Sequence, residues 1–350
     1  MYRCLQLAKL GAGNVAPNPM VGAVLVYSEK IIGEGYHKKF GDAHAEVNCI
    51  NSVKQEDKNL IEKSTLYVSL EPCSHFGKTP PCTDLIIKNK VPKVVIGCKD
   101  VYKKVDGKGI KKLQDAGLEV ITEALEKECT ELNKRFFTFH RQHRPYVILK
   151  WAESANGKIT SSPPSPLPSP QVERATRTFI SNDFSNRLVH KWRSEEASIL
   201  IGTNTALQDD PSLTTRLWHG NNPIRMVIDL NLRLPSRLKI FNRETKTIVF
   251  NKLKYEEGGN LIFYKIEEEN PLPQILKASY EFQIHSVIVE GGAILLQSFI
   301  DEGLWDEARI ICNEELIISN GIKSPGFKNA VLQEQENYFS DTISYFLPSS

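Results

Sequence analysis

Four residues in the first half of the chain combine the side chains of a zinc site with those of a general acid–base. His44 and Glu46 lie two positions apart, and Cys73 and Cys82 follow them, the first directly after Pro72. One imidazole and two thiolates are a plausible three-ligand set for zinc, with a fourth position left open for water. Zinc brings the pKa of such a water towards about 7, and Glu46 is placed to carry protons to a leaving amine. The pattern predicts hydrolytic deamination.

The spacing of the two cysteines departs from the usual signature of zinc deaminases. That signature is His-x-Glu followed by Pro-Cys-x-x-Cys, whereas here eight residues, SHFGKTPP, separate Cys73 from Cys82. Taken singly, the cysteines fit core positions and His44 fits a surface position. Taken together, with the proline before Cys73 and the turn-rich insert, they indicate a catalytic metal site.

Two other interpretations of this site stay open at this point. A nucleoside or tRNA-type deaminase with an accessory domain predicts the short Cys-x-x-Cys spacing and, for RNA, a basic surface; the sequence has neither. A structural zinc module fused to a nucleotide-sensing domain predicts a fourth protein ligand and gives Glu46 no role.

Length and composition narrow the class of protein. A chain of 350 residues suggests two domains, with one or three as alternatives. A net charge of +2 argues against a general nucleic-acid or anionic-membrane binder. No apolar run approaches the roughly 18 residues that span a bilayer, the N-terminal stretch is amphipathic, and seven cysteines do not indicate a disulfide framework. We expect a cytoplasmic protein with no membrane or nucleic-acid partner.

Short apolar strands alternate with helices along the first half. Strands are predicted at 21–27 and 30–36, as a hairpin, and at 65–69, 93–97 and 119–122; helices are predicted at 2–10, 43–51, 82–89 and 109–116. This alternation is typical of an α/β layer fold in which much of the sheet is parallel. His44 and Glu46 share one of these predicted helices.

A second series of strands follows the run RQHRP at 141–145. It is predicted at 146–150, 198–202, 224–229, 247–250 and 286–290, so we place a domain boundary at residue 144 and predict domains 1–144 and 145–350. Ser161–Pro170 reads SSPPSPLPSP, which is too rich in proline for a helix or a central strand. We expect a surface loop there; a ligand for a proline-recognising domain is the alternative.

Three motifs of the first half resemble one family. PNPMVGAV at 17–24, HAEV at 44–47 and LEPCSHFGKTPPC at 70–82 are similar to the deaminase half of the bifunctional riboflavin-biosynthesis deaminase–reductases. The resemblance implies a cytidine-deaminase-like fold with one zinc per chain. It implies a small-molecule substrate, a phosphorylated diamino-ribosylamino-pyrimidinone, whose ring amine is hydrolysed to a carbonyl with release of ammonia.

Four further residues are candidates for binding this substrate: Asn18, His75, Lys78 and Thr79. The amide of Asn18 offers donors and an acceptor to the edge of a heterocycle, although a turn asparagine would look the same. Lys78 supplies a point charge suited to a ribose phosphate, although it also fits a solvated lysine. His37 is expected to be structural or to support the other residues.

In the second half of the chain, the sequence pattern alone gives weaker evidence for a function than in the first half. Gly291 and Gly292 follow a predicted strand and precede a predicted helix, a turn that lets phosphate approach backbone N–H groups. There is no G-x-G-x-x-G, so a Rossmann fingerprint is not supported.

The second half resembles the reductase half of the same family in four stretches. They are LKWAESANGKI at 149–159, HKWR at 190–193, ILIGTNTALQDDPSLTTR at 199–216 and VEGGA at 289–293. That implies a dihydrofolate-reductase-like fold, NADPH as cofactor, reduction of the ribosylamino sugar to a ribitylamino chain, and a homodimer or homotetramer.

The resemblance also implies individual roles in the second half. Cofactor-binding positions are matched by Phe179, Ser181, Thr205, Asp209, Gly291 and Gly292, and substrate-binding positions by Lys150, Arg193, Leu213, Arg216 and Glu290. The two guanidinium groups suit a ribose phosphate, the carboxylate suits hydroxyls or the pyrimidine edge, and the lysine is a candidate proton donor near the sugar oxygen. The chain departs from the family at residues 154–157, SANG in place of SLDG, and at 179–181, FIS in place of WIT.

Overall fold

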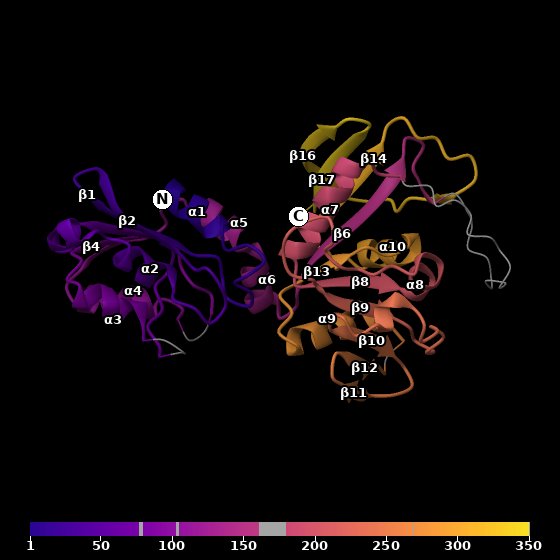
Figure 1. The fold of residues 1–350 in the computed structure, drawn as a ribbon, viewed down its shortest axis with the longest axis horizontal. Coiled ribbons are helices and arrows are strands. Elements are labelled where there is room, and N and C mark those ends of the chain that lie inside the picture. The colour runs from indigo at the N-terminus through magenta and orange to yellow at the C-terminus, as the bar shows by residue number, and fades with distance from the viewer. Residues whose placement is uncertain (77–79, 103–104, 161–179, 268, 350) are drawn as a thin grey trace. The chain divides into compact units, whose positions relative to one another are not determined.

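The chain folds into two compact units, Met1–Arg144 and Pro145–Ser350, which are described separately (Figure 1). The computed structural model describes residues 1–76, 80–102, 105–160, 180–267 and 269–349. Lys78, Thr79, Phe179 and the proline-rich run Ser161–Pro170 lie outside the described residues.

The first unit is built on a five-stranded sheet in the order β2-β1-β3-β4-β5. The strands are β1 (Gly22–Tyr27), β2 (Lys30–Tyr36), β3 (Thr65–Leu70), β4 (Lys93–Cys98) and β5 (Glu119–Ile121). The predicted hairpin is confirmed, because β1 and β2 pair antiparallel around the turn at Ser28 and Glu29. The strands from β3 to β5 pair in parallel, as the alternation of strands and helices predicts.

Helices cover both faces of this sheet. α2 (Ala45–Asn51), α3 (Cys82–Lys88) and α4 (Lys108–Asp115) pack into one core cluster, together with the 3₁₀ helix η1 (Gln55–Lys63). α1 (Tyr2–Lys9), α5 (Glu126–Leu132) and α6 (Lys134–Gln142) pack into two others. Strand β1 shows the division: Ala23 and Leu25 join the α2 cluster, whereas Val24 between them joins the α1 cluster, as side chains alternate along a strand.

The second unit is built on a ten-stranded sheet in the order β11-β12-β10-β9-β8-β13-β6-β14-β17-β16. From β12 to β14 every neighbouring pair is parallel, and the pairs at both edges are antiparallel. The strands are β6 (Tyr146–Ser154), β8 (Ser198–Gly202), β9 (Ile224–Ile228), β10 (Thr247–Asn251), β11 (Glu256–Gly258), β12 (Leu261–Lys265), β13 (Ser286–Val289), β14 (Glu307–Asn313), β16 (Ala330–Tyr338) and β17 (Asp341–Pro348). β7 (Lys158–Thr160) and β15 (Ile322–Lys323) form a separate two-stranded sheet.

The helices of the second unit also cover both faces of its sheet. α7 (Asp183–Glu195) and α8 (Thr203–Asp209) contribute to one core cluster, and α9 (Pro271–Glu281) and α10 (Ala293–Asp301) to another. β8 and β13 are parallel neighbours, and α8 follows β8 as α10 follows β13. The two strand-to-helix turns therefore lie at the same edge of the sheet, the usual place for a ligand site in parallel sheets.

None of the helices among the described residues is both long enough and apolar enough to cross a membrane.

Candidate active sites

The three predicted zinc ligands converge on one point in the first unit. His44 is the N-cap residue of α2, and Cys82 is the first residue of α3. Nδ1 of His44 lies 3.6 Å from Sγ of Cys73 and 3.3 Å from Sγ of Cys82. The three ligand atoms all lie within 4.8 Å of one another, and no second group of three or more metal-ligating side chains is found among the described residues.

The chemistry of the two thiols fits a divalent cation. The backbone N–H of Cys82 donates to Sγ of Cys73 at 3.3 Å. Hydrogen bonds from Cys82 and His44 lower the pKa of Cys73, whereas the hydrogen bond with Cys73, together with burial, raises the pKa of Cys82. Ionisation of one thiol therefore opposes ionisation of the other, and a cation between them removes that opposition.

Glu46 lies beside these ligands in the first turn of α2. Its side chain is buried, with 3 % of the residue exposed. Burial is the main cause of a raised pKa for this carboxyl, and the negative charge of Cys73 adds to it. A raised pKa makes this carboxylate a better proton acceptor than a solvated glutamate, which suits a group that shuttles protons.

Asn18 reaches the same site through His37. Nδ2 of Asn18 lies 3.2 Å from Nε2 of His37, and Nδ1 of His37 lies 3.1 Å from the carbonyl oxygen of Ala43. A carbonyl can only accept, so Nδ1 carries the proton and Nε2 accepts from the Asn18 amide. The His37 ring in turn packs edge-on against His44, with ring centroids 5.4 Å apart. His37 thus sets the direction in which Asn18 presents its amide.

His75 follows Cys73 in the chain and packs against Tyr102, with ring centroids 6.2 Å apart. Its Nδ1 is buried and has no hydrogen-bond partner among the described residues. An orphaned buried nitrogen at this position is consistent with a ligand contact. Lys78 and Thr79, which follow His75 in the sequence, are outside the described residues, so their roles stay predictions.

Glu71 is a residue of this site that sequence reasoning missed. It directly precedes Pro72 and Cys73 and is 4 % exposed. Its carboxylate accepts backbone N–H groups of the loop and helix start that follow β4, among them those of Asp100, Gly107, Gly109 and Ile110. The glutamate therefore ties the segment that carries a zinc ligand to a second loop. Its only sequence signal is its place in the motif LEPC.

In the second unit, two predicted substrate residues pair with each other. Nε of Arg193 lies 2.8 Å from Oε1 of Glu290, and Nη2 lies 2.7 Å from Oε2. Nζ of Lys150 lies 3.9 Å from the same Oε2. Burial alone raises the pKa of Glu290, but the charges of Arg193 and Lys150 and the hydrogen bond from Arg193 outweigh it and lower that pKa to about 2.

Arg216 belongs to the same cluster through His190, a residue to which the sequence assigns no role. The backbone N–H of Arg216 donates to Nδ1 of His190 at 3.0 Å, and Nη1 of Arg216 donates to Oγ1 of Thr214 at 3.0 Å. Burial lowers the pKa of His190 to about 4, and the charges of Arg193 and Arg216 add to the effect. Leu213, on the same segment, is buried and has a left-handed backbone with φ 53°.

Three of the predicted cofactor residues, Thr205, Gly291 and Gly292, lie at the turns after β8 and β13. A Cβ built on Gly292 would lie 3.4 Å from Oγ1 of Thr205, so the Thr205 hydroxyl faces the glycine turn. A Cβ on Gly291 would lie 2.7 Å from Leu295, so a larger side chain would displace that leucine. Asp209 is the last residue of α8 and is exposed. Ser181 lies before α7, where its hydroxyl donates to Asn186 at 3.0 Å.

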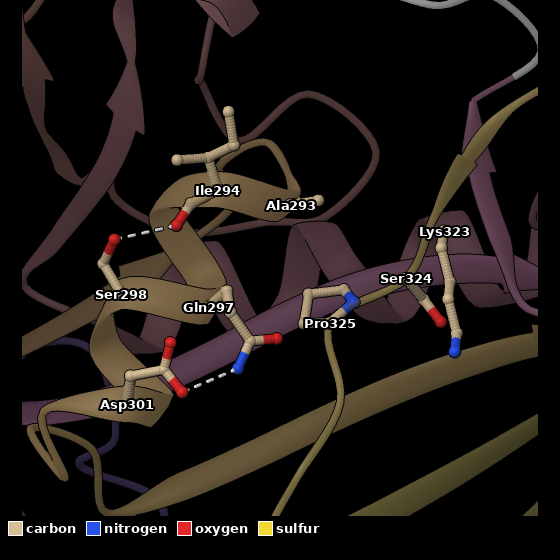
Figure 2. Close-up of a pocket in the computed structure, with 8 residues that line it drawn as sticks. All are labelled: Ala293, Ile294, Gln297, Ser298, Asp301, Lys323, Ser324 and Pro325. Carbon is tan, nitrogen blue, oxygen red and sulfur yellow. Dashed lines mark hydrogen bonds between the residues drawn. The ribbon is translucent and has the colours of Figure 1, made fainter.

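A cavity of about 360 Å³ lies along α10, directly after this glycine turn. Figure 2 shows the helix on one side and the segment from Lys323 to Pro325 on the other. The side chain of Gln297 crosses towards this segment, where it donates to the carbonyl of Gly326 and accepts from its N–H. The lining residues are Ala293, Ile294, Gln297, Ser298, Asp301, Lys323, Ser324 and Pro325.

Comparisons with known proteins agree on both halves of the chain. Residues 1–98 match the family described as the cytidine and deoxycytidylate deaminase zinc-binding region, and residues 145–314 match the RibD C-terminal domain. The riboflavin biosynthesis protein RibD of Aquifex aeolicus is 38 % identical over 99 % of this chain and 97 % of that protein. RibD of Bacillus amyloliquefaciens is 36 % identical over 88 % of this chain and 81 % of that protein.

A crystal structure from Thermotoga maritima extends the agreement to the fold. It superposes with a TM-score of 0.87 at 34 % identity and covers 100 % of this chain and 97 % of its own. That protein is described as a diaminohydroxyphosphoribosylaminopyrimidine deaminase and 5-amino-6-(5-phosphoribosylamino)uracil reductase. Full-length identity above 30 %, two matching domain families and a zinc ligand set in place show that the chain belongs to the RibD family of bifunctional riboflavin-biosynthesis deaminase–reductases.

Proposed function

We propose that residues 1–144 deaminate the phosphorylated diamino-ribosylamino-pyrimidinone and that residues 145–350 then reduce its ribosyl chain with NADPH. The observation that carries the proposal is the convergence of His44, Cys73 and Cys82 beside the buried carboxyl of Glu46. Three ligands and an adjacent acid–base group suit hydrolysis better than a structural zinc site, which has four protein ligands.

In the deaminase half, each residue has a task that follows from its chemistry. The three ligands would hold zinc, which supplies the Lewis acidity that brings the pKa of a water in the open position towards about 7. Glu46 would take a proton from the attacking water and deliver it to the departing amine. Asn18, oriented by His37, would read the pyrimidine edge, and His75 would offer its orphaned Nδ1 to the same ligand. Lys78 and Thr79 are proposed to bind the ribose phosphate.

In the reductase half, the charged cluster would bind the substrate. Arg193 and Lys150 lie at the carboxylate of Glu290, and Arg216 joins the cluster through His190. These three cations outnumber the one carboxylate, so the four side chains together carry a net positive charge that suits a phosphate. Glu290 remains ionised at neutral pH and can accept hydrogen bonds from sugar hydroxyls. Leu213 would contact the substrate through its backbone, and Lys150 is the candidate proton donor to the sugar oxygen.

The turns after β8 and β13 would hold NADPH, which supplies the hydride. Gly291 and Gly292 leave the backbone at the start of α10 open to phosphate, and Thr205 faces the same turn. The cavity along α10 is lined from Ala293 onward, the residue that follows Gly292. Asp209, Phe179 and Ser181 are proposed as further cofactor contacts.

We propose a cytoplasmic homodimer or homotetramer that acts on small molecules and on neither membranes nor nucleic acids. All seven cysteines are free, and reducing conditions keep the zinc-binding thiols available. The near-neutral net charge of +2 supports the absence of a nucleic-acid partner.

Absorbance of NADPH and release of ammonia test the proposal together. We expect zinc-loaded protein given the pyrimidinone phosphate to release ammonia and then to consume NADPH in a substrate-dependent manner. Ammonia without NADPH oxidation would support the deaminase half and overturn the reductase assignment. Neither signal from folded, zinc-replete protein would overturn both.

A further inference from the structure

His190 links two parts of the proposed reductase site, the Arg193–Glu290 ion pair and the segment that carries Arg216. It is on α7, three residues before Arg193, so both side chains project from one face of that helix. Arg193 contacts Glu290 after β13, and His190 contacts Arg216 in the segment after α8. Helix α7 therefore contacts both the carboxylate of Glu290 and the backbone of the segment that carries Arg216.

The contact to Arg216 defines the tautomer of His190. A backbone N–H can only donate, so Nδ1 of His190 accepts at 3.0 Å and the proton of the neutral ring lies on Nε2. His190 is 6 % exposed, so water competes little for this hydrogen bond. The imidazole acts here as a fixed acceptor for one backbone group.

The segment that carries Arg216 needs such an anchor. Asp210 and Leu213 both have left-handed backbone, with φ 39° and 53°. Non-glycine residues in that region cost free energy and persist only where the surroundings hold them. At its start the segment is held by Lys239 and Arg225, which donate to the carbonyls of Asp210 and Ser212. Nearer Arg216 its backbone N–H groups donate to the exposed Asn222, from Thr215 at 2.8 Å, and to the buried His190.

We propose that His190 is a positioning residue of the reductase site: by accepting the backbone N–H of Arg216 at Nδ1, it holds the Arg216 side chain in place for the substrate phosphate. The proposal rests on the substrate role given to Arg216 above. It separates His190 from the groups that touch the substrate and predicts that His190 acts only through Arg216.

Two variants of His190 differ in where they place an acceptor. In His190→Asn, the side-chain oxygen falls near the position of Nδ1; in His190→Gln, it falls one bond farther out. We expect Asn to keep KM for 5-amino-6-(5-phosphoribosylamino)uracil within about threefold of wild type. We expect Gln, and likewise His190→Leu, to raise that KM about tenfold, the usual effect of one lost hydrogen bond. KM for NADPH should change less than twofold in all three.

A double-mutant cycle with Arg216→Ala separates positioning from general damage. If His190 acts through Arg216, the double variant His190→Gln/Arg216→Ala has the KM of Arg216→Ala alone. Additive effects, equal behaviour of Asn and Gln, or a parallel rise in KM for NADPH would each overturn the proposal. If Arg216→Ala itself leaves KM unchanged, the substrate role of Arg216 fails, and the proposal fails with it. Because Asn and Gln are both polar, the comparison holds even where the Leu variant does not fold.

Discussion

Arg193 and Glu290 face each other in a two-point ion pair, with Nε 2.8 Å from Oε1 and Nη2 2.7 Å from Oε2. The two side chains are 12 % and 10 % exposed. The charge of Arg193 is therefore largely balanced by Glu290 within the protein itself. Lys150 and Arg216 add two further cations to this cluster, and we propose that they bind the substrate phosphate.

Breaking this pair from one side should destabilise the second unit. Glu290→Gln keeps the shape of the side chain but leaves the Arg193 guanidinium buried without a counter-charge, which costs about 3–5 kcal/mol. For a domain of about 200 residues this lowers Tm by roughly 10 °C. Glu256→Gln is the matched control, because Glu256 is 60 % exposed in its pair with Lys254, and exposed pairs contribute less than about 1 kcal/mol. Calorimetry that found equal shifts for both variants would contradict the prediction.

The stability of the second unit should depend on pH through His190. Burial and the charges of Arg193, Arg216 and Lys150, only partly offset by Glu290, lower its pKa to about 4. Between about pH 6.5 and 4 the unfolded chain protonates this histidine and the folded chain does not, so stability falls as pH falls through that window. The loss reaches about 3 kcal/mol at most. We expect wild type to have a higher free energy of unfolding in urea than His190→Asn at pH 7. This difference between the two proteins should disappear by pH 4.5. A margin that does not change with pH would count against this assignment.

The sequence predicts those elements whose patterns are local. The hairpin of β1 and β2 follows from two apolar runs around a polar turn, and β8 and β13 follow from short, mainly apolar runs. The hairpin of β16 and β17 is not predicted, because β16 has no buried residue and its middle, residues 333–337, is polar throughout. Its strand character comes from pairing with β17. Tertiary pairing overrides local pattern at such an edge.

The candidate sites also contain some residues that local sequence patterns predict and others that depend on the tertiary structure. Long motifs predict the zinc ligands and Glu46, because their chemistry is visible in the residue types themselves. The partners of Arg193 and His190 lie 97 and 26 positions away along the chain. Their pairing depends on which strands are neighbours in the sheet, and no spacing rule within one sequence supplies that order.

Glu46→Gln should abolish deamination while leaving zinc bound. The amide keeps the shape of the carboxyl but cannot take a proton from water, and loss of general acid–base catalysis costs about 10²–10⁴ in rate. We expect one zinc per chain by metal analysis and unchanged NADPH oxidation on the deaminated substrate. Glu62→Gln is the control, since Glu62 is exposed and pairs only at the surface with Lys90. Full ammonia release from Glu46→Gln would rule out the proposed role.

Cys73→Ser should remove zinc and deamination together. The neighbours of Cys73 lower the pKa of its thiol, so it is the more readily ionised of the two cysteine ligands. A serine hydroxyl at this position does not ionise and binds zinc weakly. Because the two units are compact on their own, NADPH oxidation with deaminated substrate should persist. The control is Cys312→Ser in the second unit, which should keep zinc and ammonia release. If NADPH oxidation also disappears in Cys73→Ser, the two units depend on each other for folding.

His37 should affect deamination through Asn18. His37→Phe removes the acceptor at Nε2, so the Asn18 amide is free to turn away from the orientation that the 3.2 Å contact imposes. We expect KM for the pyrimidinone phosphate to rise about tenfold, since one oriented hydrogen bond is lost, with kcat changed less. His37→Gln, whose side-chain oxygen can accept from Asn18, should recover most of the difference. Steady-state ammonia release gives KM and kcat, and zinc content shows whether the neighbouring His44 has kept its place. Equal KM values for the two variants would mean that the ring, which packs against His44, matters for the metal site rather than for Asn18.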